Sequence, residues 1–62
     1  MDGFMTRFIR RDGRPAEEYY YHSLAEAEHH MNLFRDDNSD LYDHIDVVDL
    51  KTMKQKAVLN FR

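Results

Sequence analysis

Five consecutive polar residues in the middle of the chain could bind a cation: Asp36, Asp37, Asn38, Ser39 and Asp40. Counted from Asp36, oxygen-bearing side chains occupy positions one, three and five of an EF-hand calcium loop. That loop also needs glycine at position six and a bidentate glutamate at position twelve. Leu41 and Val47 stand there instead. We therefore expect a polar loop and no calcium site.

Four histidines could bind zinc or transfer protons: His22, His29, His30 and His44. A structural zinc site needs about four converging ligands. His29 and His30 are neighbours in an expected helix, where successive side chains point about 100° apart, so they do not aim at one ion. The chain has no Cys, which excludes thiolate ligands. We expect neither a metal nor another cofactor.

Catalytic chemistry has no clear set of residues in this chain. Ser23 is better explained as a helix N-cap, and Ser39 lies in a polar segment without a motif around it. A single helix on one sheet, within 62 residues, leaves little room for a substrate cavity of about 300 Å³ or more. The sequence therefore predicts a protein that is not an enzyme.

Four arginines lie between residues 7 and 14: Arg7, Arg10, Arg11 and Arg14. They are interspersed with aromatic residues, and an aromatic sheet face beside cations is typical of proteins that bind single-stranded nucleic acid. However, the formal net charge of the chain is -3, whereas nucleic-acid modules are usually basic. Binding of single-stranded nucleic acid is therefore an alternative to the function that we predict below, which is the binding of a protein.

The elements that must position these residues are recognisable from side-chain alternation. Four segments predict strands: residues 4–11, 17–22, 42–50 and 55–61. Between the second and third, Ser23 and Glu26 form a capping box, which predicts a helix N-terminus. Apolar residues then recur at spacings of three and four: Leu24, Ala27, Met31 and Phe34. We expect this helix to end near residues 35–37.

This ββαββ order predicts one α+β domain over residues 1–62. Because the directions of the elements alternate, the simplest arrangement is a four-stranded antiparallel sheet in the order 2-1-3-4, with the helix packed on one face. A regular first hairpin places Tyr19 and Tyr21 on the core face with Phe8. Arg7 then lies near Glu18 on the opposite face. Hydrophobic residues make up 42% of the chain, which predicts a packed core.

Charge is distributed unevenly along the chain: +2 over residues 1–15, -9 over residues 16–50 and +4 over residues 51–62. The simplest explanation is that basic and acidic strands pair across the sheet. The alternative is an acidic surface that meets a basic partner, as in a decoy or inhibitor from a mobile element. That alternative requires five carboxylates on one surface: Asp36, Asp37, Asp40, Asp43 and Asp46.

Interaction residues are predicted in two places. Leu33 points away from the apolar stripe of the helix, and the sheet face without a helix carries further apolar side chains: Met5, Ile9, Tyr20, Val48 and Val58. A domain this small, without disulfides, often gains stability by self-association. We therefore predict a small protein-interaction or regulatory module that forms a homodimer or binds a protein partner.

The N-terminal hairpin, the segment Ser23-Leu24-Ala25-Glu26 and the strand around Ile45 together resemble small uncharacterised ββαββ proteins of bacteria, especially Firmicutes and their mobile elements. The resemblance implies a bacterial or phage source, and it carries no catalytic residues. No apolar run approaches the roughly 20 residues of a membrane helix, and no secretory signal is visible. We therefore expect a soluble cytoplasmic protein that does not bind membranes.

Overall fold

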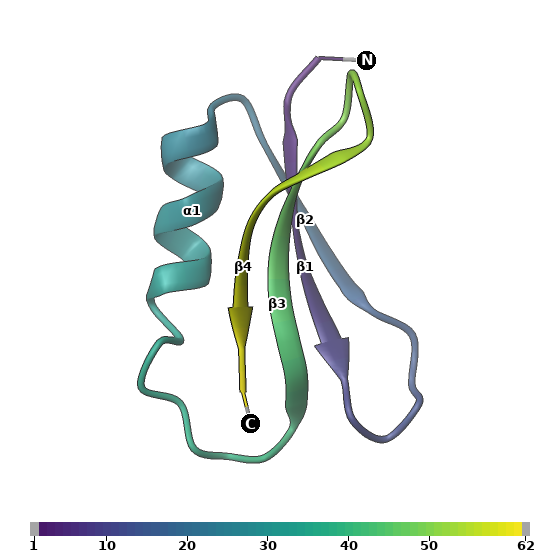
Figure 1. Ribbon diagram of the computed structural model, residues 1–62, viewed down its shortest axis with the longest axis vertical. Helices are drawn as coiled ribbons and strands as arrows, with labels where there is room; N and C mark the ends of the chain where they lie inside the picture. The colour runs from purple at the N-terminus through teal and green to yellow at the C-terminus, as the bar shows by residue number, and fades with distance from the viewer. Residues whose placement is uncertain (1, 62) are drawn as a thin grey trace.

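The computed structural model describes residues 2–61 as four strands and one helix (Figure 1). The elements follow in this order: β1 (Phe4–Arg10), β2 (Glu17–Tyr21), α1 (Leu24–Asn32), β3 (Tyr42–Asp49) and β4 (Lys54–Asn60). The strands form one antiparallel sheet in the order β2-β1-β3-β4. The predicted α+β class and the predicted strand order are therefore both confirmed.

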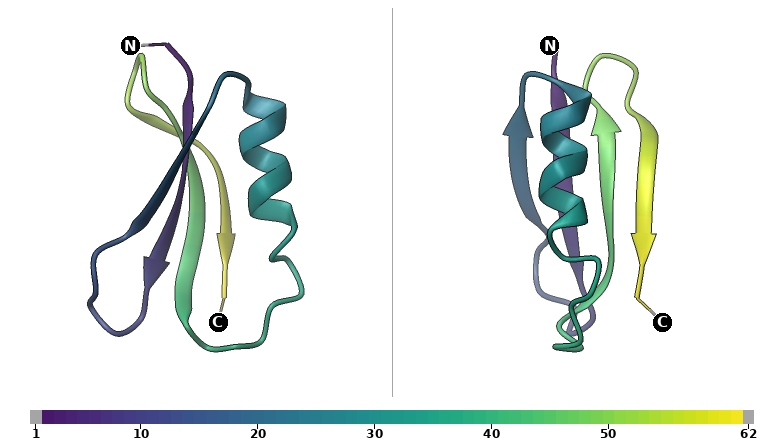
Figure 2. Two further views of the ribbon diagram at one scale, coloured as in Figure 1. Left: turned by 180° about the vertical axis from the view of Figure 1, so that it is seen from behind. Right: turned by 90° about the vertical axis from the view of Figure 1, so that its left-hand side faces the viewer.

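The sheet has one face covered by α1 and one face without a helix (Figure 2). The register of the first hairpin pairs Thr6 with Tyr19 and Phe4 with Tyr21, as the alternation predicts. The same register pairs Arg7 with Glu18 on the uncovered face. β2 and β4 are the edge strands, and β1 and β3 are the central ones.

The core forms between α1 and the central strands. Phe8, Ile45 and Val47 are 0–1% exposed, and Ala27 and Met31 of α1 pack against them. The Thr6 hydroxyl is also buried, and it donates a hydrogen bond of 2.9 Å to the carbonyl oxygen of Ala27. This bond satisfies the only polar group that Thr6 adds to the core and links β1 directly to the helix.

The helix begins as predicted and ends earlier than predicted. The Ser23 hydroxyl accepts the Glu26 N–H at 3.2 Å, and it donates to the Glu26 carboxylate at 3.2 Å. α1 ends at Asn32 rather than near residues 35–37. Beyond it, i to i+3 bonds such as Phe34 N–H to Met31 C=O tighten the chain into turns. These turns still bring Phe34 against the core.

An ion pair between Arg7 and Asp46 lies at the centre of the uncovered face. Asp46 of β3 is 1% exposed, and Arg7 of β1 donates two hydrogen bonds to it, at 2.9 and 2.6 Å. Gln55 of β4 donates a third, at 3.1 Å. Burial raises the pKa of Asp46, but the bonds from Arg7 and Gln55 outweigh it, so the pKa lies below its ordinary value. Basic and acidic strands therefore do pair across the sheet.

Two predicted interaction residues need correction. Met5 and Val48 lie on the uncovered face and pair with each other across β1 and β3, but they are only 6% and 4% exposed. Cross-strand neighbours on both sides cover them in the central part of this narrow sheet. They stabilise the fold and offer almost no surface to a partner.

Removal of the Asp46 carboxylate tests the importance of the ion pair. We expect Asp46→Asn to lower the free energy of unfolding by about 2 kcal/mol in urea titrations, less than for a fully buried pair because water reaches part of Arg7. Asp43→Asn is the matched control on the same strand, since Asp43 is largely exposed, and it should cost under about 0.5 kcal/mol. Equal losses would show that the ion pair is no stronger than a surface contact.

A second test concerns the glycine before β1. Gly3 has φ of 120°, and a Cβ there would lie 2.9 Å from the carbonyl oxygen of Tyr21. We expect Gly3→Ala to lower stability by about 3 kcal/mol, from strain and collision together. Gly13→Ala should cost only about 1 kcal/mol, because Gly13 also has positive φ but no described atom within 4 Å of the added carbon. Thermal or urea unfolding measures both, and a larger loss for Gly13→Ala would contradict the expectation.

Candidate functional site

Two hollows in the surface meet at the edge strand β2. The first, of about 430 Å³, lies between β2 and α1. The second, of about 500 Å³, lies beside the end of β2. Tyr21 lines both hollows, so the last residues of β2 separate them. We call Tyr20, Tyr21 and the two hollows the β2 edge site.

The first hollow is a mainly apolar groove on the helix side of β2. Its lining residues are Tyr21, Ala25, Glu26, His29, His30 and Leu33. Leu33 follows the last residue of α1 and is 66% exposed. The structure therefore places this predicted interaction residue in the wall of a groove, where an incoming apolar side chain can contact it.

The second hollow is open to the uncovered side of the sheet and is more polar. Its lining residues are Asp2, Tyr20, Tyr21, His22 and Leu50. The Tyr20 ring is 58% exposed, and its hydroxyl donates to the Glu18 carboxylate at 3.1 Å. The Leu50 N–H donates to the carbonyl oxygen of Gly3 at 3.0 Å, and a Cβ added at Gly3 would lie 2.9 Å from the carbonyl oxygen of Tyr21. The carboxylate of Asp2 makes this hollow suitable for a cationic side chain.

The outer edge of β2 presents backbone hydrogen-bonding groups between the two hollows. The carbonyl of Tyr21 faces β1, because it lies next to Gly3 at the start of that strand. Backbone groups of successive strand residues point in opposite directions. The N–H and C=O of Tyr20 and Glu18 therefore point away from the sheet, where a further strand can pair with them.

His30 joins the first hollow to the aromatic part of the core. Its Nδ1 lies 2.7 Å from the Tyr21 hydroxyl, and its ring packs against Phe8, Tyr19 and Phe34. Burial, and secondarily the charge of His29, lower the pKa of His30 from its ordinary value. A neutral ring protonated on Nε2 lets Tyr21 donate to Nδ1 and fixes the wall of the groove.

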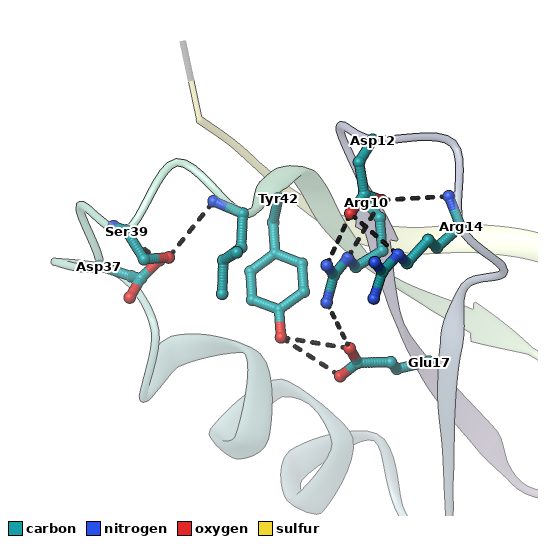
Figure 3. Close-up of polar contacts among 8 residues, drawn as sticks. Arg10, Asp12, Arg14, Glu17, Asp37, Ser39 and Tyr42 are labelled. Atoms are coloured by element: carbon teal, nitrogen blue, oxygen red, sulfur yellow. Dashed lines mark hydrogen bonds and ion pairs between the residues drawn. The ribbon is translucent and has the colours of Figure 1, made fainter.

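A polar network holds the opposite end of β2 in place (Figure 3). The Tyr42 hydroxyl donates to Glu17 at 3.2 Å, and Arg10 contacts Glu17 at 3.4 Å and Asp12 at 2.7 Å. The bond from Arg10, with one from the Arg14 N–H, lowers the pKa of Asp12 to about 2. The network fixes the β1–β2 loop against β3, so its role is structural.

All four arginines proposed for nucleic-acid binding contact carboxylates of the same chain. Arg7 pairs with Asp46, and Arg10 pairs with Asp12 and Glu17. Arg11 lies 4.0 Å from Asp43, and Arg14 lies 3.5 Å from Asp12. Because these contacts neutralise much of the positive charge, the geometry gives the nucleic-acid alternative no support.

The five aspartates of the decoy hypothesis do not form one exposed surface. Asp46 is buried against Arg7, and Asp43 lies 2.8 Å from His44. Asp37 accepts a hydrogen bond from the Ser39 hydroxyl at 2.7 Å within the loop after α1. The acidic segment is thus divided between a local turn, a strand surface and an internal ion pair.

The remaining predicted interaction residues lie apart from one another. Tyr20 belongs to the β2 edge site, while Ile9 and Val58 lie on the uncovered face, with Val58 43% exposed on β4. Sequence reasoning did not identify Tyr21 and His30 as site residues, although the predicted strand order already makes β2 an edge. The available signal was the run of three tyrosines at this edge, of which we predicted Tyr20 as an interaction residue and assigned Tyr19 and Tyr21 to the core.

Comparison with known protein families, with curated proteins and with solved structures finds no match to this chain. Across residues 2–61, no three His, Asp or Glu side chains converge as a metal site would require. No helix in that range is long and apolar enough to cross a membrane. Bacterial origin, cytoplasmic location and the absence of enzymatic activity all stay predictions.

The buried position of His30 predicts a dependence of stability on pH. Its pKa in the folded protein is lower than the ordinary 6.5, so below pH 6.5 the unfolded chain takes up the proton more readily. The stability that neutral His30 contributes is therefore complete above this pH and declines as the pH falls toward the folded value. We expect the melting temperature to drop between pH 7 and pH 5.

His30→Phe should reduce this drop, because it keeps an aromatic ring in the cluster and removes the titrating group. His22→Gln, at an exposed position outside the cluster, is the control and should retain the full drop. If His30→Phe melts with the same pH dependence as the parent protein, His30 is not the group responsible.

Proposed function

We propose that this chain is a small protein-interaction module that binds an extended segment of a partner protein along the outer edge of β2. The observation that carries the proposal is the position of the two hollows, which flank the outward-facing backbone of this strand. Strand addition of this kind derives affinity from main-chain hydrogen bonds and specificity from pockets for alternate side chains.

The geometry requires a partner segment in which the side chains that enter the first hollow differ in polarity from those that reach the second. A strand paired with β2 directs successive side chains to opposite faces of the sheet. Those on the helix side enter the first hollow, where Ala25 and Leu33 favour an apolar group. Those on the other side reach the second hollow beside Tyr20 and Asp2.

Charge further restricts the partner. Among residues 2–61, each hollow is lined by one carboxylate, Glu26 in the first and Asp2 in the second, and by no Lys or Arg. Glu18 adds a third carboxylate on the edge strand itself, next to Tyr20. A segment that alternates Lys or Arg with aliphatic residues complements this surface, and its association should weaken with added salt.

The experiment uses a synthetic octapeptide of alternating lysine and leucine, capped at both ends, and follows the protein amides by NMR. We expect the largest shift changes at the amides of Glu18 and Tyr20, with smaller changes at Leu33 on α1. An octapeptide with glutamate in place of lysine, and one with a central proline, should bind at least tenfold more weakly.

Two exposed leucines provide matched protein variants. Leu33→Arg removes an apolar wall of the first hollow and adds a repelling charge, so it should weaken the lysine–leucine peptide at least tenfold. Leu41→Arg adds the same charge at a leucine outside both hollows and should change the affinity less than twofold. Equal effects of the two variants, or shift changes confined to residues far from β2, would refute binding at this edge.

A further inference from the structure

Histidines are concentrated at the β2 edge site. The chain has four of them, and three line the two hollows: His29 and His30 the first, and His22 the second. His44 lies on β3, with its Nδ1 2.8 Å from the Asp43 carboxylate, and lines neither hollow. Histidine is the side chain whose charge ordinarily changes between pH 5 and pH 8. The charge of this site is therefore expected to depend on pH.

The helix presents its two histidines to the first hollow beside a carboxylate. His29 lies four residues after Ala25 and four before Leu33, and all three line the hollow. Glu26 precedes His29 by three residues and His30 by four, spacings that make side chains neighbours on a helix surface. His29 and Glu26 are exposed, whereas His30 is half-buried. The α1 side of this hollow thus combines one carboxylate with two imidazoles.

The groups that pack against His30 from the other elements are aromatic. From β2, the Tyr21 hydroxyl lies 2.7 Å from Nδ1, and the Tyr19 ring packs against the imidazole. From β1 and from the turn after α1, the rings of Phe8 and Phe34 contact it. None of these four groups balances a positive charge on the imidazole as a carboxylate would.

The other charged side chains around the site are mostly acidic. Besides the histidines, the titratable residues that line the hollows or adjoin their lining residues include Asp2, Glu18, Tyr20, Glu26 and Glu28. Arg35, beyond the helix, donates to the Asn32 side chain and lines neither hollow. The lining of the first hollow therefore changes from one negative to one positive charge when both of its histidines are protonated. The lining of the second changes from one negative charge to none.

We propose that the β2 edge site binds its partner strand at neutral pH and releases it when His22, His29 and His30 take up protons. The inference rests on the binding of a basic, alternating segment proposed above. Protonated His22 repels a lysine that enters the second hollow beside Asp2. Protonated His29 and His30 oppose an aliphatic side chain in the first hollow, because it displaces water from the charged rings. Both hollows therefore disfavour the same segment in acid.

Protonation of His30 also changes the wall between the hollows. The neutral ring accepts a hydrogen bond from the Tyr21 hydroxyl at Nδ1, whereas a doubly protonated ring only donates there. Because Tyr21 lines both hollows, reversal of this bond affects both. Burial, and secondarily the charge of His29, lower the pKa of His30, so this change comes late in the acidification. We expect the exposed His22 and His29 to begin the release and His30 to complete it.

The affinity for the capped lysine–leucine octapeptide at two pH values is the direct test. The peptide lysines keep their charge at pH 7.5 and at pH 5.5, so a change in affinity comes from the protein. In NMR titrations at low salt we expect the peptide to bind at least tenfold more weakly at pH 5.5. Equal affinity at both pH values would refute the inference alone. No binding at either pH would refute the proposed function together with the inference.

Glutamine variants identify the histidines responsible. In the double variant His22→Gln with His29→Gln, the ratio of the affinities at pH 7.5 and pH 5.5 should fall from at least tenfold to below about threefold. His44→Gln removes the one histidine outside the hollows and should retain the full ratio. Circular dichroism at both pH values checks that each variant is folded. Equal ratios in the two variants would contradict the proposal, because a general loss of structure in acid affects both alike.

The histidine protons themselves provide an independent measurement. If protonation weakens peptide binding, the bound peptide must oppose protonation by the same free energy. We therefore expect the imidazole NMR signals of His22 and His29 to titrate at a lower pH when the peptide is saturating, and those of His44 to be unaffected. Signals of His22 and His29 that titrate identically with and without peptide would overturn the proposal, even if the affinity fell in acid.

Discussion

A single helix must cover a sheet that is wider than the helix itself, and most features of this protein follow from that constraint. An α-helix with its side chains is about 10–12 Å across. Four strands spaced about 4.8 Å apart place the outermost pair about 14 Å from each other, before their side chains are counted. α1 therefore buries Phe8, Ile45 and Val47 on the central strands completely, whereas Tyr19 on β2 and Leu59 on β4 remain partly exposed. The β2 edge site lies where this cover is incomplete.

On the face without a helix, polar side chains rather than a helix cover the central strands. Arg7 lies across the face and shields Asp46, whose carboxylate is satisfied by three hydrogen bonds. Within residues 2–61 every buried side-chain nitrogen or oxygen has a hydrogen-bond partner. The pair occupies the centre of the face, so that this face presents few apolar side chains there. An ion pair of this kind contributes less to stability than apolar packing does, but it tolerates water on one side, as an uncovered sheet requires.

The fold was predictable from the sequence because its signals are local. Alternation defined the strands to within about one residue, and the capping box at Ser23 located the helix start. The helix end was not predictable in the same way, since the tightened turn after Asn32 depends on how Phe34 reaches the core. The burial of Asp46 depends on Arg7, 39 residues away, so its spacing carried no local signal. Tyr20 and Leu33 of the β2 edge site were predicted as interaction residues, but Tyr21 and His30 were not. A tyrosine in a strand is compatible with a core or with an edge, and only packing distinguishes them.

The position of β1 also has a consequence for synthesis of the chain. β1 is the first strand to be made, yet it lies in the interior of the sheet and needs β3 as well as β2 at its sides. Phe8 can contact Tyr19, His30 and Phe34 once the hairpin and the helix are made. Its contacts with Ile45 and Tyr42 form only when β3 follows, more than thirty residues later in the chain. A nascent chain that contains only the hairpin and the helix therefore lacks the β3 partner on one side of β1. The central part of the sheet cannot be complete before β3 has been made, because β1 is paired on both sides only then.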